Sequence, residues 1–244
     1  MRTRGAPTSF LVALVLGWAL TSGCRQAAGP PEPPAPYVGV AQSILEDYVA
    51  GNCSLVERRA APEQIASWPA DENRHATTLL RGFCFEQRGD REGARAIYQA
   101  LVDEAPGSFS GEDARERLRY LDRAQEDPEW ERWVLDAAKR ADPRAKTRTP
   151  IERVPAEFPP LAHASNVEGY TVVEFGVTPD GETRSPIVVD SSPPYLFDGA
   201  SIRAVRGWQF MSEPGSDEGH RQVIRLLFAP EPTAAAAVAG SSAR

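Results

Sequence analysis

The sequence predicts an α+β protein, in which an N-terminal helical module precedes a small ββαβ domain with a three-stranded antiparallel sheet. Three observations support this. Apolar residues recur at helical spacing between Val40 and Ala141. Apolar and polar residues then alternate, as in half-buried strands, after Thr171, Thr183 and Arg221. Between the first two of these segments lies a TPDG sequence, which is strong turn chemistry because proline presets one corner and glycine accepts positive φ.

Residues 1–23 have the layout of an export signal. Two arginines precede an apolar run that is shorter than the roughly 20 residues of a membrane-spanning helix. The small residues just before Cys24 resemble a bacterial lipobox. This resemblance implies that Cys24 is lipidated and becomes the first residue of the mature chain, placed on the periplasmic side of the envelope. An uncleaved membrane anchor and plain secretion are the two alternatives.

The cysteine count is compatible with export. If Cys24 carries lipid, Cys53 and Cys84 remain as an even pair in an oxidising compartment. A disulfide closing that loop of about 30 residues would add roughly 3–4 kcal/mol in the chain-entropy model. The alternative is two buried free thiols on apolar helix faces, which is a common role for cysteine.

A proline-rich tether over residues 24–38 leads into the helical module, residues 39–141. Helices are expected from about Val40 to Ala50 and from Leu55 to Ala60, with Pro62 breaking the pattern. Stronger helical patterns cover residues 76–88 and 92–102. Ser110 is expected to begin the next helix, with Asp113 in capping-box position.

The last helix of the module, residues 128–141, carries two tryptophans. We expect Trp130 and Trp133 to pack on the preceding helices rather than to form a ligand platform.

Small and bulky residues in the middle of this module follow the order of a tetratricopeptide repeat. They are Leu80, Gly82, Phe83, Gly89, Asp90, Ala94, Tyr98 and Pro106. The segment resembles one such repeat, in which small residues let two helices approach closely and large ones fill the seam. A simple helical hairpin is the alternative. The function is then either protein docking or a spacer.

A polar linker, residues 142–150, separates this module from the C-terminal domain, residues 151–230. In the first strand Thr171, Val173, Phe175 and Val177 share one face, and Pro186 marks an edge or a bulge in the second. In the expected helix between Phe197 and Trp208, the apolar residues and Ser201 lie on one side, while Arg203 and Arg206 point outward. In the last strand Ile224, Leu226 and Phe228 form the buried face. Residues 231–244 are expected to be a disordered tail.

Several short motifs of this domain occur in a characteristic order. They are Phe158-Pro159, Ala162, Glu168-Gly169, the FGVTPDG run ending at Gly181, Ser191, Phe197, Ala204-Val205, the WQF run ending at Phe210, and the VIRLLF run ending at Phe228. With these motifs, residues 155–229 resemble the C-terminal domain of TonB energy transducers.

The resemblance implies a periplasmic domain that grips outer-membrane transporters by strand addition to its sheet edge. The implied partner-binding edge is the last strand: Gln222, Val223, Ile224, Arg225, Leu226, Leu227 and Phe228. The alternative is an ordinary strand whose edge is covered by the tail or by a second copy of the chain.

The chain departs from TonB transducers in three ways. The apolar run before Cys24 lacks a histidine, helices replace the long proline-rich segment, and the glutamine-proline pair that is common before the domain is absent at Pro155-Ala156. Two functions are therefore expected. One is a TonB-type protein that contacts outer-membrane transporters; the other is a lipid-anchored envelope scaffold without energy transduction.

Other classes of function find no support in the sequence. A net charge of −7 is unfavourable for non-specific nucleic-acid binding. His75, His163 and His220 lack zinc-ligand spacing, and the sequence has no phosphate loop, nucleophile elbow or dinucleotide fingerprint. We therefore expect no enzyme activity, catalytic residue, metal, cofactor or small-molecule substrate. The oligomeric state is not specified.

Overall fold

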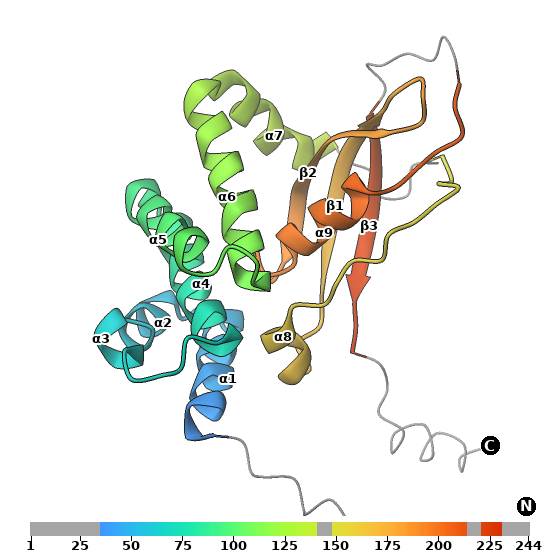
Figure 1. Cartoon of the computed structure of the whole chain (residues 1–244). Helices are drawn as coiled ribbons and strands as arrows, with labels where there is room; N and C mark the ends of the chain where they lie inside the picture. Colours follow the sequence, from blue (N-terminus) through green and yellow to red (C-terminus); the bar gives the residue numbers. More distant parts are fainter. Residues whose placement is uncertain (1–34, 141–147, 214–220, 231–244) are drawn as a thin grey trace, which may run out of the picture. The chain divides into compact units, whose positions relative to one another are not determined.

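The computed structural model describes residues 35–140, 148–213 and 221–230 (Figure 1). The expected export signal, Cys24, most of the tether, linker residues 142–147 and the tail lie outside the described residues. No helix within the described part of the chain is both long enough and apolar enough to cross a membrane.

Helices fill the first part of the described chain. They are α1 (Pro36–Val49), α2 (Cys53–Arg59), α3 (Pro62–Ile65), α4 (Glu72–Gln87), α5 (Arg91–Glu104), α6 (Phe109–Glu126) and α7 (Pro128–Arg140). The second part contains α8 (Pro160–Ala164), β1 (Gly169–Val177), β2 (Thr183–Ser192), α9 (Asp198–Arg206) and β3 (Arg221–Phe228). The predicted α+β fold, with helices followed by a ββαβ unit, is confirmed.

Several helix starts differ from the prediction. Pro36 begins α1 inside the expected tether. The helical pattern breaks before Pro62, as predicted, because α2 ends at Arg59, and Pro62 then begins the short helix α3. Proline is accepted in a first helical turn because the N–H it lacks would have no partner there. The predicted capping box at the start of α6 is wrong: Ser108 is the N-cap and accepts a hydrogen bond from the Gly111 amide, while Asp113 is buried.

Helices α4 and α5 pack against each other as a hairpin. Gly82 permits this contact, because a Cβ atom there would lie 2.4 Å from a ring carbon of Tyr98. Phe83 meets the Tyr98 ring edge-on, with ring centroids 6.2 Å apart. These contacts agree with the expected roles of small and large residues, and the tetratricopeptide-like character of the segment remains a prediction.

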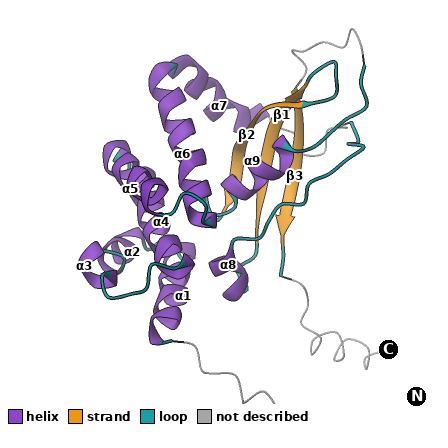
Figure 2. Cartoon of the chain, in the orientation of Figure 1, coloured by secondary structure: helices purple, strands orange, loops and turns teal. Residues whose placement is uncertain are grey.

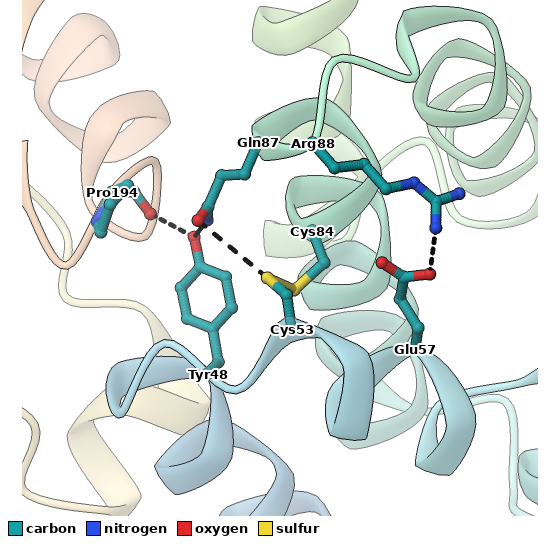
Figure 3. The surroundings of a disulfide bond; sticks show 7 residues. All are labelled: Tyr48, Cys53, Glu57, Cys84, Gln87, Arg88 and Pro194. Carbon is teal, nitrogen blue, oxygen red and sulfur yellow. Dashed lines mark hydrogen bonds and ion pairs between the residues drawn. A yellow bond between two sulfur atoms is a disulfide. The ribbon is translucent and has the colours of Figure 1, made fainter.

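A disulfide joins Cys53 at the start of α2 to Cys84 in α4 (Figure 3). Beside it, Gln87 donates a hydrogen bond to the Tyr48 hydroxyl, at 2.8 Å. That hydroxyl donates in turn to the carbonyl oxygen of Pro194, at 2.5 Å. Pro194 lies between β2 and α9, so Tyr48 of α1 links Gln87 of the bridged helix α4 to the C-terminal domain.

The sheet is antiparallel, in the order β2-β1-β3 (Figure 2). The register between β1 and β3 runs without interruption from Gly169 opposite Phe228 to Gly176 opposite Arg221. The register between β1 and β2 shifts twice, once where Ser185 and Pro186 lie. Pro186 therefore marks an irregularity in an outer strand, as predicted.

The helical module and the sheet share a hydrophobic core. Helix α9 covers one face of the sheet through Val205, which packs with Phe175 and Trp208. The larger core contains Phe83 of α4 together with Phe197 and other residues of the C-terminal domain. The described residues therefore lie within one compact unit.

The sequence predicted that the two arginines of α9 point outward. Arg206 is 45% exposed, whereas Arg203 is partly buried, and both reach carboxylates of α6. Arg203 donates to a carboxylate oxygen of Asp113 at 2.5 Å. Arg206 donates twice to Glu116, at 2.8 and 2.9 Å. Both carboxylates are buried. The prediction was wrong for Arg203, because its acidic partner is 90 residues away in the sequence.

Candidate functional site

The candidate partner-binding site is the outer edge of β3. Strand β3 pairs with β1 on one side, and within the described residues no strand or bridge pairs with its other side. Helices α6 and α7 lie toward β2, at the opposite end of the sheet (Figure 2). An outer strand leaves alternate backbone N–H and C=O groups unpaired by the sheet. This edge can therefore accept a further strand.

Side chains on the inner face of β3 hold the strand in place. They are Gln222, Ile224, Leu226 and Phe228. Phe228 is buried and stacks on Phe197, with ring centroids 4.3 Å apart. Phe158 meets the Phe228 ring edge-on at 5.7 Å. The C-terminal end of the strand is thus fixed by aromatic packing.

The N-terminal end of β3 is fixed by polar contacts. The Arg221 Nε atom donates to Glu174 at 2.7 Å, and Nη2 donates to the Ser185 carbonyl oxygen at 2.9 Å. The Gln222 side-chain oxygen accepts a hydrogen bond from the Arg148 amide at 2.7 Å. Burial lowers the pKa of Arg221, and the charge of Glu174 partly offsets this effect.

Two side chains on the outer face of β3, Arg225 and Leu227, are exposed. Leu227 is 74% exposed. The Arg225 guanidinium lies over the Tyr170 ring, 3.9 Å from its centroid. Both ends of β3 are therefore anchored, while its backbone edge and outer face stay accessible to a partner.

The other predicted site residues fall in different places. Cys24 lies outside the described residues, and Cys53 and Cys84 are far along the chain from β3. His75 is buried and His163 is exposed, while His220 is not among the described residues. Among the residues that the structure describes, no cluster of three or more histidine, cysteine or acidic side chains could hold a metal ion.

Sequence reasoning missed a buried charge network between the helices and the C-terminal domain. Arg117 of α6 forms an ion pair with Glu86 of α4, and its Nη1 atom lies 3.9 Å from Asp198 of α9. Tyr98 donates a hydrogen bond to Glu86 at 2.9 Å. Burial would lower the pKa of Arg117, but the charge and hydrogen bonds of Glu86 raise it. This network holds the helical module against α9.

Two buried carboxyl groups in this region have raised pKa values. Burial raises the pKa of Asp113 to about 7, although the Arg203 guanidinium opposes the shift. Burial also raises the pKa of Asp198 to about 6, against the effect of Arg117. No signal in the sequence distinguishes these carboxylates from solvated ones, because their burial depends on packing between distant segments.

Comparisons with known proteins assign this C-terminal region. Residues 154–228 match the family described as Gram-negative bacterial TonB protein C-terminal. Protein TonB of Escherichia coli (strain K12) is 33% identical over 78 residues, which are 32% of this chain and 31% of that protein. The chain thus aligns with about a third of the length of this curated relative.

A solved structure of the TonB2 protein from Vibrio anguillarum covers 37% of this chain and 90% of its own, at 23% identity and a TM-score of 0.28. That score is too low to support any argument about the fold. The family match rests on the sequence and agrees with the ββαβ unit found here. Residues 154–228 are therefore a TonB-family C-terminal domain.

Proposed function

We propose that this protein binds an extended segment of an outer-membrane transporter, which adds as a strand to the outer edge of β3. One observation carries the proposal. The two ends of β3 are fixed by aromatic and polar contacts, while its outer backbone edge has no strand partner among the described residues. Because the edge is already ordered, a partner segment would not have to order the receptor strand on binding. Main-chain hydrogen bonds would supply the affinity, and flanking side chains the specificity.

The outer face of β3 would add modest selectivity. A partner strand on this edge would place alternate side chains beside Arg225 and Leu227. Cross-strand pairs of this kind contribute about 0.2–1 kcal/mol each. An acidic residue beside Arg225 and an apolar one beside Leu227 would therefore favour a partner without determining its binding alone.

We further propose that the protein is held on the periplasmic side of the envelope by lipid on Cys24. The small residues that precede this cysteine support this proposal. Labelling cells with radioactive palmitate tests it, with Cys24→Ala as the matched variant. We expect label only in the wild type. An unlabelled wild type that is expressed at the same level contradicts lipidation.

The test of strand addition uses a peptide from the N-terminal box of a TonB-dependent transporter. We expect the peptide to bind the purified protein, as measured by calorimetry. The same peptide with N-methylated backbone amides should bind at least about tenfold more weakly, which corresponds to about 1.4 kcal/mol. N-methylation removes backbone donors and leaves the side chains and the receptor unchanged. Equal binding of the two peptides contradicts strand addition.

A substitution in the receptor gives an independent test. Ile224→Pro removes a backbone donor and strains the strand, so we expect peptide binding to be lost. Circular dichroism checks that this variant is folded. Leu227→Ala serves as a mild companion, with a few-fold weaker affinity and unchanged folding. Wild-type affinity in folded Ile224→Pro would exclude β3 as the binding edge.

A lipid-anchored scaffold without energy transduction is the second candidate. It is favoured by the extent of the helical module, which lies outside the TonB match and packs against the domain through a shared core. The box peptide separates the two candidates, because a scaffold of this kind has no need to bind it. If the folded protein does not bind the peptide, the scaffold is favoured.

A further inference from the structure

A groove lies between the helical module and the C-terminal domain, bordered by α6, α7, β2 and α9. Its volume of about 670 Å³ is within the range of ligand-binding clefts. The groove borders β2 and reaches only the first residue of β3, Arg221, whereas Arg225 and Leu227 do not line it. Both parts of the chain contribute to its walls.

Arginine dominates the charged lining of this groove. The lining contains two carboxylates, Glu116 and Asp198, and six arginines: Arg117, Arg119, Arg123, Arg184, Arg206 and Arg221. Glu86 and Glu174 pair with Arg117 and Arg221 from outside the lining. Arginines still outnumber carboxylates when these two are included. A positive groove on a protein of net charge −7 concentrates the attraction for anionic partners at one place.

Aromatic rings orient several of these guanidinium groups. Arg123 lies over the Trp130 ring, 4.6 Å from its centroid, and Arg221 lies over Trp133 at 5.0 Å. Within the described residues, no carboxylate forms an ion pair with Arg123. Stacking fixes the plane of a guanidinium and leaves its N–H edge available for two hydrogen bonds to a carboxylate.

The positive charges also act on one another. The charges of Arg184 and Arg123 contribute to the lowered pKa of Arg221, after the larger effect of burial. Arg221 is itself paired with Glu174. The proximity of three guanidinium groups in one groove favours an anionic occupant.

Apolar side chains line the same groove beside the arginines. They are Pro186, Ile187, Val188 and Ile202. Together with the half-buried tryptophans, they provide contact for apolar or aromatic groups. Trp130 packs against Tyr120 of α6, as the sequence predicted, whereas Trp133 also faces Arg221 of β3.

We propose that this groove binds a short acidic segment of a partner protein, with carboxylates on the arginines and an apolar side chain against the tryptophans and β2. Arginines from four different elements, α6, β2, α9 and β3, call for several carboxylates spaced along one ligand. An acidic peptide supplies them together with the apolar group. The protein then has two separate binding surfaces, the β3 edge and this groove.

The test uses the full chain and an array of short synthetic peptides that alternate Asp or Glu with Leu or Phe. A matched array carries Asn and Gln in place of the acids. We expect selective binding of acidic peptides, and we expect binding to weaken as salt rises. The affinity of the best peptide is then measured with Arg123→Glu, Trp133→Ala and the control Arg132→Glu.

Arg123→Glu should weaken binding at least about tenfold, because it replaces a charge-assisted contact by repulsion. Trp133→Ala should weaken it to a smaller extent. Arg132→Glu makes the same charge change on a highly exposed α7 side chain that does not line the groove, so it should bind as the wild type does. The box peptide should bind Arg123→Glu normally, which separates this result from the proposed function.

Three outcomes would overturn the proposal. The first is equal binding of the acidic and amide peptides. The second is equal weakening by Arg123→Glu and Arg132→Glu, which would indicate non-specific attraction. The third is binding to phosphatidylglycerol vesicles that depends on Arg123 while no peptide binds, which would assign the groove to lipid headgroups.

Discussion

The two outer strands of the sheet differ in almost every respect. Strand β2 has an irregular register, contains Pro186 and Ser185 with φ of 45°, and is flanked by α7 and α9. Strand β3 pairs with β1 without interruption and has no neighbouring strand on its outer side among the described residues. Proline, bulges and covering elements are the usual protection of an exposed edge. This protection is concentrated on β2, which supports β3 as the proposed edge for strand addition.

The largest expected effect comes from the charge network that holds the helices beside β2. Arg117→Ala leaves Glu86 and Asp198 buried without their cation. We expect a loss of about 3–5 kcal/mol in the free energy of unfolding, measured by urea denaturation. Arg119→Ala is the matched control, since this side chain is 56% exposed and its pair with Glu116 contributes about 0–1 kcal/mol. Equal losses in the two variants would contradict a special role for Arg117.

The disulfide lies in the same helical module as Arg117, where it joins α2 to α4. Replacing Cys53 and Cys84 by alanine should cost about 3–4 kcal/mol, because the unfolded chain gains freedom when the 31-residue separation is no longer bridged. Thermal unfolding measures this loss. Peptide binding at the β3 edge should stay within about twofold of wild type wherever the variant is folded. A folded variant without peptide binding would show that the two edges are coupled.

A pH-dependent effect follows from the buried carboxyl of Asp113. Its pKa of about 7 in the folded protein is above the unfolded value of 3.8, so the folded state binds more protons between these pH values. Its contribution to stability is therefore fully present below about pH 4 and is lost as pH rises through 7. In this window the free energy of unfolding of the wild type should fall by up to about 1.4 kcal/mol per pH unit because of Asp113. Asp113→Asn should lack this part of the pH dependence.

Urea denaturation of the wild type and Asp113→Asn at a series of pH values checks this prediction. Arg203 opposes the raised pKa of Asp113, while Asp198 and Glu72 add to it. The difference between the two curves therefore reports the net effect of all these charges on Asp113. Curves that run parallel over the whole window would show that Asp113 is ionised in the folded protein throughout. Binding of the box peptide to β3 should not follow this titration.

Local sequence signals were sufficient for most elements of the sheet. The TPDG turn, the alternation in β1 and the apolar positions of α9 predicted the ββαβ unit, because turns and strand faces depend on neighbouring residues. Pro186 likewise indicated which strand would be irregular. The same local logic failed at Asp113 and Arg203, where a capping residue and an outward arginine were expected, but an interhelical ion pair is present.

The sequence by itself therefore determined the fold class and the resemblance of the C-terminal domain to TonB. This resemblance implies β3 as the partner edge. The tertiary structure decided how the two outer strands differ. It also decided which carboxylates are buried and where six arginines meet at one groove. The ion pairs between α6 and α9, for example, join residues 90 apart in the sequence. Burial and ion pairing between such segments depend on packing, and no local pattern in the sequence records them.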